Sequence, residues 1–124
     1  MGELSIYFFD TYAFFESLEG NVNYRPYKST GIVTSRMNLM ELHYGLLLQH
    51  GKEFADRVYE DFVDYTVEID DETIKEATVF KLLHKGCGLS YIDCLGYVMA
   101  KRLNFKFLTG DRQFEDMENV EFVK

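Results

Sequence analysis

The sequence predicts an α/β fold in which a mostly parallel central sheet of four to five strands is flanked by helices. Short apolar segments that are typical of buried strands alternate with longer segments whose apolar residues recur at helical spacing. This alternation indicates βαβ units, which form parallel sheets between helices. With 124 residues, 47% of them hydrophobic, the chain is long enough for a substantial core and fits a single domain over residues 1–124.

The first half of the chain is expected to form two strands and three helices. LSIYFFD (4–10) predicts a buried strand, and a short helix over 11–18 ends near Gly20. NVNYRPYKST contains the only proline and predicts a surface loop, after which GIVTS forms the second strand. A helix over 37–49 should end at Gly51, and a further helix over 54–65 completes a hairpin. The first helix of the hairpin has an apolar stripe of Leu39, Met40, Leu42, Leu46 and Leu47.

In the second half, TVEI (66–69) predicts another strand, and Asp70 or Asp71 is suited to cap a helix that runs to about His84. The expected apolar side of that helix consists of Ile74, Ala77, Phe80, Leu82 and Leu83. KGCG then breaks the chain. The segment SYIDCLGYVMAKRLN is apolar nearly all round and predicts a helix at the centre of the core. FKFL and the terminal VEFV provide the remaining strands.

The charge and the cysteine content exclude several classes of protein. A net charge of −8 argues against a general basic surface for nucleic acid, because lysine and arginine supply most non-specific affinity. Two cysteines, Cys87 and Cys94, are too few for a disulfide framework and should be reduced. No apolar run approaches the roughly 20 residues that span a bilayer, and no basic leader is present. We therefore expect a soluble, cytoplasmic protein that does not act at a membrane.

Four acidic residues are predicted at one edge of the sheet. Asp10 ends the first strand, and Asp111 follows the strand FKFL in the turn LTGDRQ. Glu41 lies near the start of the helix after the second strand, and Asp93 lies one turn into the central helix. Because functional groups in open α/β sheets gather outside the carboxyl ends of the strands, we expect all four side chains at this edge.

Capping offers a structural explanation for some of these acids. Asn38 to Glu41 and Ser90 to Asp93 both have the spacing of a capping box, and Asp111 is a suitable N-cap. Capping does not explain Asp10, which follows an apolar strand. Four carboxylates in one cleft repel one another, and a divalent cation would neutralise them. Hard oxygen ligands favour Mg²⁺ or Mn²⁺.

The segments that contain these acids resemble the PIN domain, the metal-dependent ribonuclease fold of VapC-like toxins. They are FFDTYAFFE, TSRMNLMELHYGLL, LSYIDCLGYVMAKRLN and FLTGDRQFEDMENVEFV, in the family's order and over nearly the whole chain. The resemblance implies that four carboxylates are catalytic and hold metal, namely Asp10, Glu41, Asp93 and Asp111, with support from Thr11, Asn38 and Ser90. A haloacid-dehalogenase site would need a second aspartate where Tyr12 stands, and a response-regulator receiver matches only loosely.

The resemblance implies an endoribonuclease that uses Mg²⁺ or Mn²⁺ to cleave RNA phosphodiester bonds, as the toxin of a toxin–antitoxin pair. An antitoxin protein and a second copy of the chain are the expected protein partners. Because the protein is acidic, RNA would need a local basic approach, for which Arg25, Lys28 and Arg36 are the candidates. Two alternatives stay open: a non-catalytic module whose acidic pocket binds a partner's arginine, and an RNA-processing nuclease of the same fold.

Overall fold

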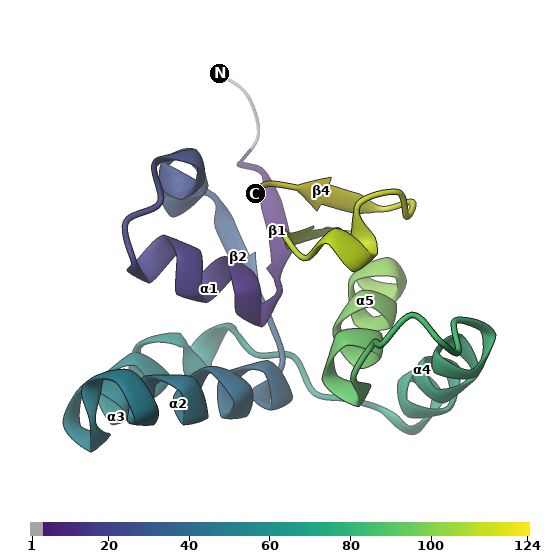
Figure 1. Cartoon of the computed structure of the whole chain (residues 1–124), viewed down its shortest axis with the longest axis horizontal. Coiled ribbons are helices and arrows are strands. Elements are labelled where there is room, and N and C mark those ends of the chain that lie inside the picture. The colour runs from purple at the N-terminus through teal and green to yellow at the C-terminus, as the bar shows by residue number, and fades with distance from the viewer. Residues whose placement is uncertain (1–3) are drawn as a thin grey trace.

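The computed structural model describes residues 4–124 and contains a four-stranded parallel sheet with the strand order β2-β1-β3-β4. This arrangement confirms the predicted fold class (Figure 1). Strand β1 pairs with both β2 and β3, so Asp10 follows a central strand. The strands are β1 (Ile6–Phe9), β2 (Gly31–Val33), β3 (Lys106–Thr109) and β4 (Val120–Phe122).

Helices cover both faces of the sheet, with α1, α2 and α3 on one side and α4 and α5 on the other (Figure 1). The α-helices are α1 (Thr11–Leu18), α2 (Arg36–His50), α3 (Lys52–Phe62), α4 (Asp71–Leu83) and α5 (Tyr91–Leu103). Short 3₁₀ helices are η1 (Val22–Ser29), η2 (Val63–Tyr65) and η3 (Arg112–Phe114). Within residues 4–124, no helix has both the length and the apolar character required to cross a membrane.

Alternation along the central strands separates the core into two layers. Phe8 of β1 is paired in register with Phe107 of β3, and both side chains are buried on the side of α5. The next pair, Phe9 and Leu108, is buried on the side of α1 and α2. Successive side chains of a strand point to opposite faces of the sheet. A continuous apolar run therefore buries side chains on both faces, as expected for a sheet that is covered on both sides.

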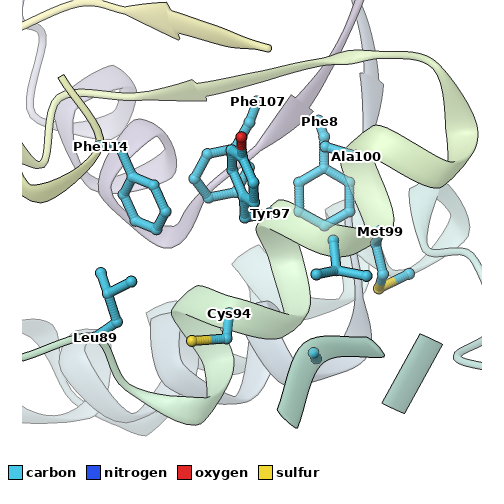
Figure 2. Close-up of a cluster of buried hydrophobic side chains, with 10 residues drawn as sticks. Phe8, Leu89, Cys94, Tyr97, Met99, Ala100, Phe107 and Phe114 are labelled. Atoms are coloured by element: carbon cyan, nitrogen blue, oxygen red, sulfur yellow. The ribbon is translucent and has the colours of Figure 1, made fainter. Parts of the chain in front are cut away.

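Helix α5 lies at the centre of the first layer, as its apolar sequence predicted. Figure 2 shows Tyr97 beside Phe8 and Phe107 of the sheet, with Cys94 one turn earlier on the same helix. Gly96 permits this close packing, because a Cβ atom there would lie 3.2 Å from both phenylalanine rings. Tight contact with the sheet therefore fixes the position of the first turn of α5, which contains Asp93.

Two segments differ from their predicted structure. TVEI was wrong as a strand: it contributes only an isolated parallel bridge between Thr66 and Thr34. Strand β2 ends at Val33, and the residue after Thr34, Ser35, already caps α2, so TVEI has no further partner for pairing. NVNYRPYKST was wrong as a loop, because it contains η1. Tyr24 anchors η1 by packing in the core and donating to the carbonyl of Val123 at 2.5 Å.

The predicted apolar side of α4 was wrong in part. Ala77 is buried and Phe80 packs against the core, but the side chains of Leu82 and Leu83 are 70% and 76% exposed. The buried stripe runs instead through Thr73, Ala77 and Phe80, because α4 contacts α5 rather than the sheet and needs only a narrow face. Asp70 caps the helix by accepting from the backbone N–H of Thr73.

Candidate functional site

The four acidic residues predicted from the sequence come from elements that meet at the carboxyl edge of the sheet. Asp10 directly follows β1, and Asp111 lies two residues beyond the end of β3. Helix α2 begins three residues after the end of β2 and contains Glu41, while Asp93 lies in the first turn of α5. The parallel arrangement of the strands therefore produces the expected gathering of acids at this edge.

Asp10 is the buried centre of this group, with only 3% of its surface exposed. Burial raises the pKa of its carboxyl from 3.8 to about 7, against the opposing effect of the Thr109 hydroxyl, which donates to Oδ2 at 2.7 Å. The negative charges of Asp93 and Glu41 raise the pKa further. These two carboxylates thus lie close enough to Asp10 for their charges to act on it.

A buried polar network joins the beginnings of α1 and α2. Asn38, fully buried, accepts from the Ser35 hydroxyl at 2.6 Å and donates to the Thr11 hydroxyl at 3.2 Å. Ser35 is the N-cap of α2, so the predicted capping box between Asn38 and Glu41 was wrong. The network leaves the Glu41 carboxylate free of a capping role and fixes the helix that contains it relative to Asp10.

Asp93 forms a reciprocal capping box with Ser90, as its spacing predicted. Its carboxylate accepts from the backbone N–H of Ser90 at 2.9 Å, and the Ser90 hydroxyl accepts from the N–H of Asp93 at 3.0 Å. Burial raises the pKa of the Asp93 carboxyl, the negative charge of Asp111 adds to this rise, and the positive charge of Lys81 opposes it. Capping therefore occupies part of the Asp93 carboxylate without removing it from the acidic group.

Asp111 also has a capping role. Its Oδ1 accepts from the backbone N–H of Gln113 at 3.0 Å and thereby begins η3, while its own N–H donates to Thr109 Oγ1 at 3.1 Å. Gly110 is required in this turn, because a Cβ atom there would collide with the Val123 carbonyl and the Tyr12 ring. The turn TGD thus joins Asp111 to Thr109, whose hydroxyl contacts Asp10.

The carboxylate oxygens of the four acids are ligands that suit Mg²⁺ or Mn²⁺, but these side chains do not converge on one point. Within residues 4–124, no three His, Cys, Asp or Glu side chains form a ready-made metal centre. Local bonds account for the separation: Asp93 is turned to the N–H of Ser90, Asp111 to that of Gln113, and Asp10 to Thr109. Mutual repulsion also favours separated carboxylates until a cation neutralises them.

The basic residues predicted to guide RNA lie in different places. Lys28 is on η1 and lines a hollow with Ser17 and Leu18, at the opposite end of α1 from Asp10. Arg25 is exposed on η1 as well. Arg36 begins α2 and borders a separate hollow of about 490 Å³ between α2 and α3. Of the three, Arg36 is on the helix that contains Glu41, so its predicted role fits the structure better than that of Lys28.

Sequence reasoning missed three residues of this edge. Thr109 contacts Asp10, Ser35 positions Asn38, and Lys81 lies near enough to Asp93 to lower its pKa. Thr109 was recognisable, because it stands in the same TGD turn as Asp111. Lys81 had no local signal, since twelve positions separate it from Asp93 in the sequence.

The sequence matches the family model of the PIN domain over residues 7–120. The chain belongs to the PIN-domain family. Among proteins with curated functions, none matches the sequence. The PIN-domain fold is typical of metal-dependent nucleases.

Solved structures that resemble this PIN domain include components of toxin–antitoxin systems. Mycobacterium tuberculosis VapC20, a Sarcin-Ricin loop cleaving toxin, is 18% identical, with 97% of this chain and all of that chain covered and a TM-score of 0.77. A chain of a Klebsiella pneumoniae toxin–antitoxin complex is 15% identical over 93% of this chain and 95% of its own, with a TM-score of 0.74. For DNA-bound Rickettsia felis VapBC2 the identity is 21%, the coverage 96% and 99%, and the TM-score 0.69. At these identities the likeness shows a shared fold.

Proposed function

We propose that this PIN domain is a Mg²⁺- or Mn²⁺-dependent endoribonuclease that acts as the toxin of a toxin–antitoxin pair. The observation that carries the proposal is the buried carboxyl of Asp10, whose pKa is raised by burial and further by Asp93 and Glu41. Burial beside other negative charges makes the ionised form of Asp10 unfavourable, whereas a divalent cation turns the repulsion into binding. The cleaving activity of VapC20 supports RNA as the substrate.

In this proposal, Asp10 and Asp93 hold the cation directly, and Glu41 and Asp111 hold a second ion or act through water. When bound, the metal lowers the pKa of a water molecule and neutralises charge on the phosphodiester. The Thr109 hydroxyl orients the Asp10 carboxylate by donating to Oδ2 at 2.7 Å. The supporting residues have matching tasks: Asn38 and Thr11 position the start of α2, and Ser90 orients the Asp93 carboxylate.

An antitoxin and a second copy of the chain are the protein partners that we propose. The complex from Klebsiella pneumoniae contains both a toxin and an antitoxin, which supports such a partner here. Large apolar side chains are exposed along α2, including Met40, Tyr44 and Leu48 at 53%, 65% and 72%. Contiguous apolar surface of this kind suits a protein interface. We propose the cytoplasm as the site of action, because the RNA substrate is there.

Cleavage of RNA by the purified protein tests this function. The protein should cut a single-stranded RNA in millimolar Mg²⁺ or Mn²⁺, stop when EDTA is added, and lose activity in Asp10→Asn. Asp61→Asn is the matched control, because it removes the same charge from an exposed position on α3. A chain that binds a partner protein but leaves RNA intact under all metal conditions would be a binding module instead.

Divalent metal should raise the melting temperature of the protein by mass action. The unfolded chain cannot assemble four carboxylates that are distant in sequence, so Mg²⁺ or Mn²⁺ binds mainly to the folded state. At 100 times the dissociation constant this binding stabilises the fold by about 2.7 kcal/mol, and Asp10→Asn should blunt the rise. Calorimetry with and without millimolar metal measures it, and superimposable melting curves would count against the site.

Asp111→Ser separates capping from metal binding. Serine and aspartate are near-equal N-caps, so the substitution should change the free energy of unfolding by less than about 0.5 kcal/mol. Loss of the carboxylate should instead weaken metal affinity and slow cleavage, most clearly at low Mg²⁺. A Mg²⁺ titration of cleavage rate measures this effect. If the titration matches that of the parent protein, Asp111 only caps η3 and the metal site consists of three acids.

A further inference from the structure

A basic and aromatic surface adjoins the Asp93 side of the carboxylate edge. It is formed by the last turns of α4, the loop that follows and the first residue of α5. Its main side chains are Lys81, Lys85 and Tyr91, and we name it the Lys85–Tyr91 surface. These residues line a hollow of about 580 Å³. The hollow is large enough for a small ligand or part of a polymer.

Contacts of Lys81 connect this surface to the carboxylate edge. Its ammonium group donates to the carbonyl of Leu89 at 2.5 Å and lies 4.9 Å from the centre of the Tyr91 ring. Leu89 and Tyr91 flank Ser90, which forms the capping box with Asp93. An RNA strand with a phosphate at Asp93 would therefore lie directly beside the Lys85–Tyr91 surface.

The charge of this surface is opposite to that of the protein as a whole. Residues 77–92 contain no Asp or Glu, although the chain has a net charge of −8. Among residues 4–124, the ion pairs include Lys52, Lys75 and Lys101 but neither Lys81 nor Lys85. The positive charge of the exposed Lys85 is therefore available to an anion from outside the chain, whereas Lys81 already contacts Leu89 and Tyr91 and acts on Asp93.

The shape of the surface suits an unpaired base. The Tyr91 side chain is 71% exposed, although the Lys81 ammonium lies 4.9 Å from the centre of its ring. Gly86 and Gly88 in the adjoining loop have positive φ angles of 95° and 76° and no side chains. The two glycines contribute no side chains to the hollow, and the exposed tyrosine offers an aromatic ring of the kind that stacks on bases in many single-strand-binding proteins.

We propose that the Lys85–Tyr91 surface binds single-stranded RNA next to the cleaved bond, with a base stacked on Tyr91 and a phosphate paired with Lys85. This inference rests on the proposed ribonuclease function. The exposed Leu82 and Leu83 would also suit a protein partner. However, the positive charge of Lys85 repels a partner segment that carries an arginine toward the acidic edge, and it attracts a phosphate. Charge complementarity therefore favours RNA.

Binding of a fluorescein-labelled single-stranded RNA of randomised sequence tests the surface. Anisotropy is measured in Mg²⁺ with the Asp10→Asn chain, which should not cut the probe. In this background Tyr91→Ala should weaken binding about tenfold, because stacking on an aromatic ring contributes about 1–3 kcal/mol per base. Lys85→Gln should reduce the slope of log affinity against log salt by about 0.7, as expected for the loss of one phosphate contact on a single strand.

Lys106→Gln is the matched control for Lys85→Gln. It removes the same charge from an exposed lysine at the amino end of β3, the opposite edge of the sheet from the carboxylates. This control should keep the parent's affinity and salt slope. Melting temperatures should stay unchanged in all three variants, because Tyr91, Lys85 and Lys106 are exposed.

Equal RNA affinity in Tyr91→Ala, Lys85→Gln and Lys106→Gln would overturn the inference and leave the surface to a protein partner. Failure of the proposed ribonuclease function can be distinguished from failure of this inference. If the unmodified chain does not cleave RNA and the Asp10→Asn chain does not bind it, both proposals fall. If the unmodified chain cleaves RNA and neither surface substitution changes binding, the ribonuclease function stands and only this inference is lost.

Discussion

Asp93→Asn is expected to slow RNA cleavage by about 100-fold or more while the fold is kept, because even residues that only orient metal ligands contribute 10–100-fold. The asparagine side chain retains an oxygen that accepts from the N–H of Ser90, so the capping box survives. What disappears is the negative charge that a cation requires. Cleavage rates in saturating Mg²⁺, together with the circular dichroism spectrum and melting curve, measure the two effects separately.

Asp70→Asn is the matched control for Asp93→Asn. Asp70 is the exposed N-cap of α4 and accepts from the N–H of Thr73. Its substitution should leave cleavage unchanged. In metal-free buffer at neutral pH, Asp93→Asn should be at least as stable as the parent, because its carboxyl has a pKa raised by burial. A large loss of stability with normal activity would make Asp93 a structural cap and remove it from the site.

The position of the acidic edge was predictable because it depends on topology. Once Asp10 and Asp111 follow parallel strands, they come to the same edge whatever the details of the intervening helices. The helix that contains Glu41 was placed correctly, but its cap was not. Ser35 and Asn38 both have capping chemistry, and only the point at which β2 ends decides that Ser35 takes this role.

The approach of Lys81 to Asp93, which the sequence did not reveal, depends on a contact between distant segments. Lys81 comes to the site because α4 packs on α5, and the sequence does not specify which face of α4 makes that contact. The same ambiguity made Leu82 and Leu83 look like core residues, although both are exposed. The exposure of these leucines and the approach of Lys81 to Asp93 thus follow from the same packing of α4 on α5. Lys81 and Leu82 also line the hollow that we assign to RNA.

The metal-free protein should lose stability as the pH rises from about 4 to about 7. The pKa of Asp10 is about 7 in the folded protein and 3.8 in a solvated aspartate, with burial as the main cause. Between these values the folded state keeps a proton that the unfolded state has released, so rising pH favours unfolding. Above pH 7 both states have lost the proton, and this contribution becomes constant.

Asp10→Asn should abolish this dependence, because asparagine does not titrate and can still accept from Thr109 through its amide oxygen. Compared with the parent, the metal-free variant should show little difference near pH 4 and should be more stable by up to about 4 kcal/mol at pH 8. Urea unfolding at intervals from pH 4 to 8 measures the difference, with Asp61→Asn as the control that should follow the parent.

Adding Mg²⁺ at pH 8 should make the parent more stable than Asp10→Asn, the reverse of their order without metal. The parent regains stability because the ionised Asp10 carboxylate binds the cation, whereas Asp10→Asn has no charge to offer and gains less. The same burial that makes the carboxylate costly in the metal-free protein therefore makes it a strong ligand once the cation is present. Unfolding curves for parent and variant that stay parallel across pH 4–8, with and without Mg²⁺, would show that Asp10 is not a charged group of the site.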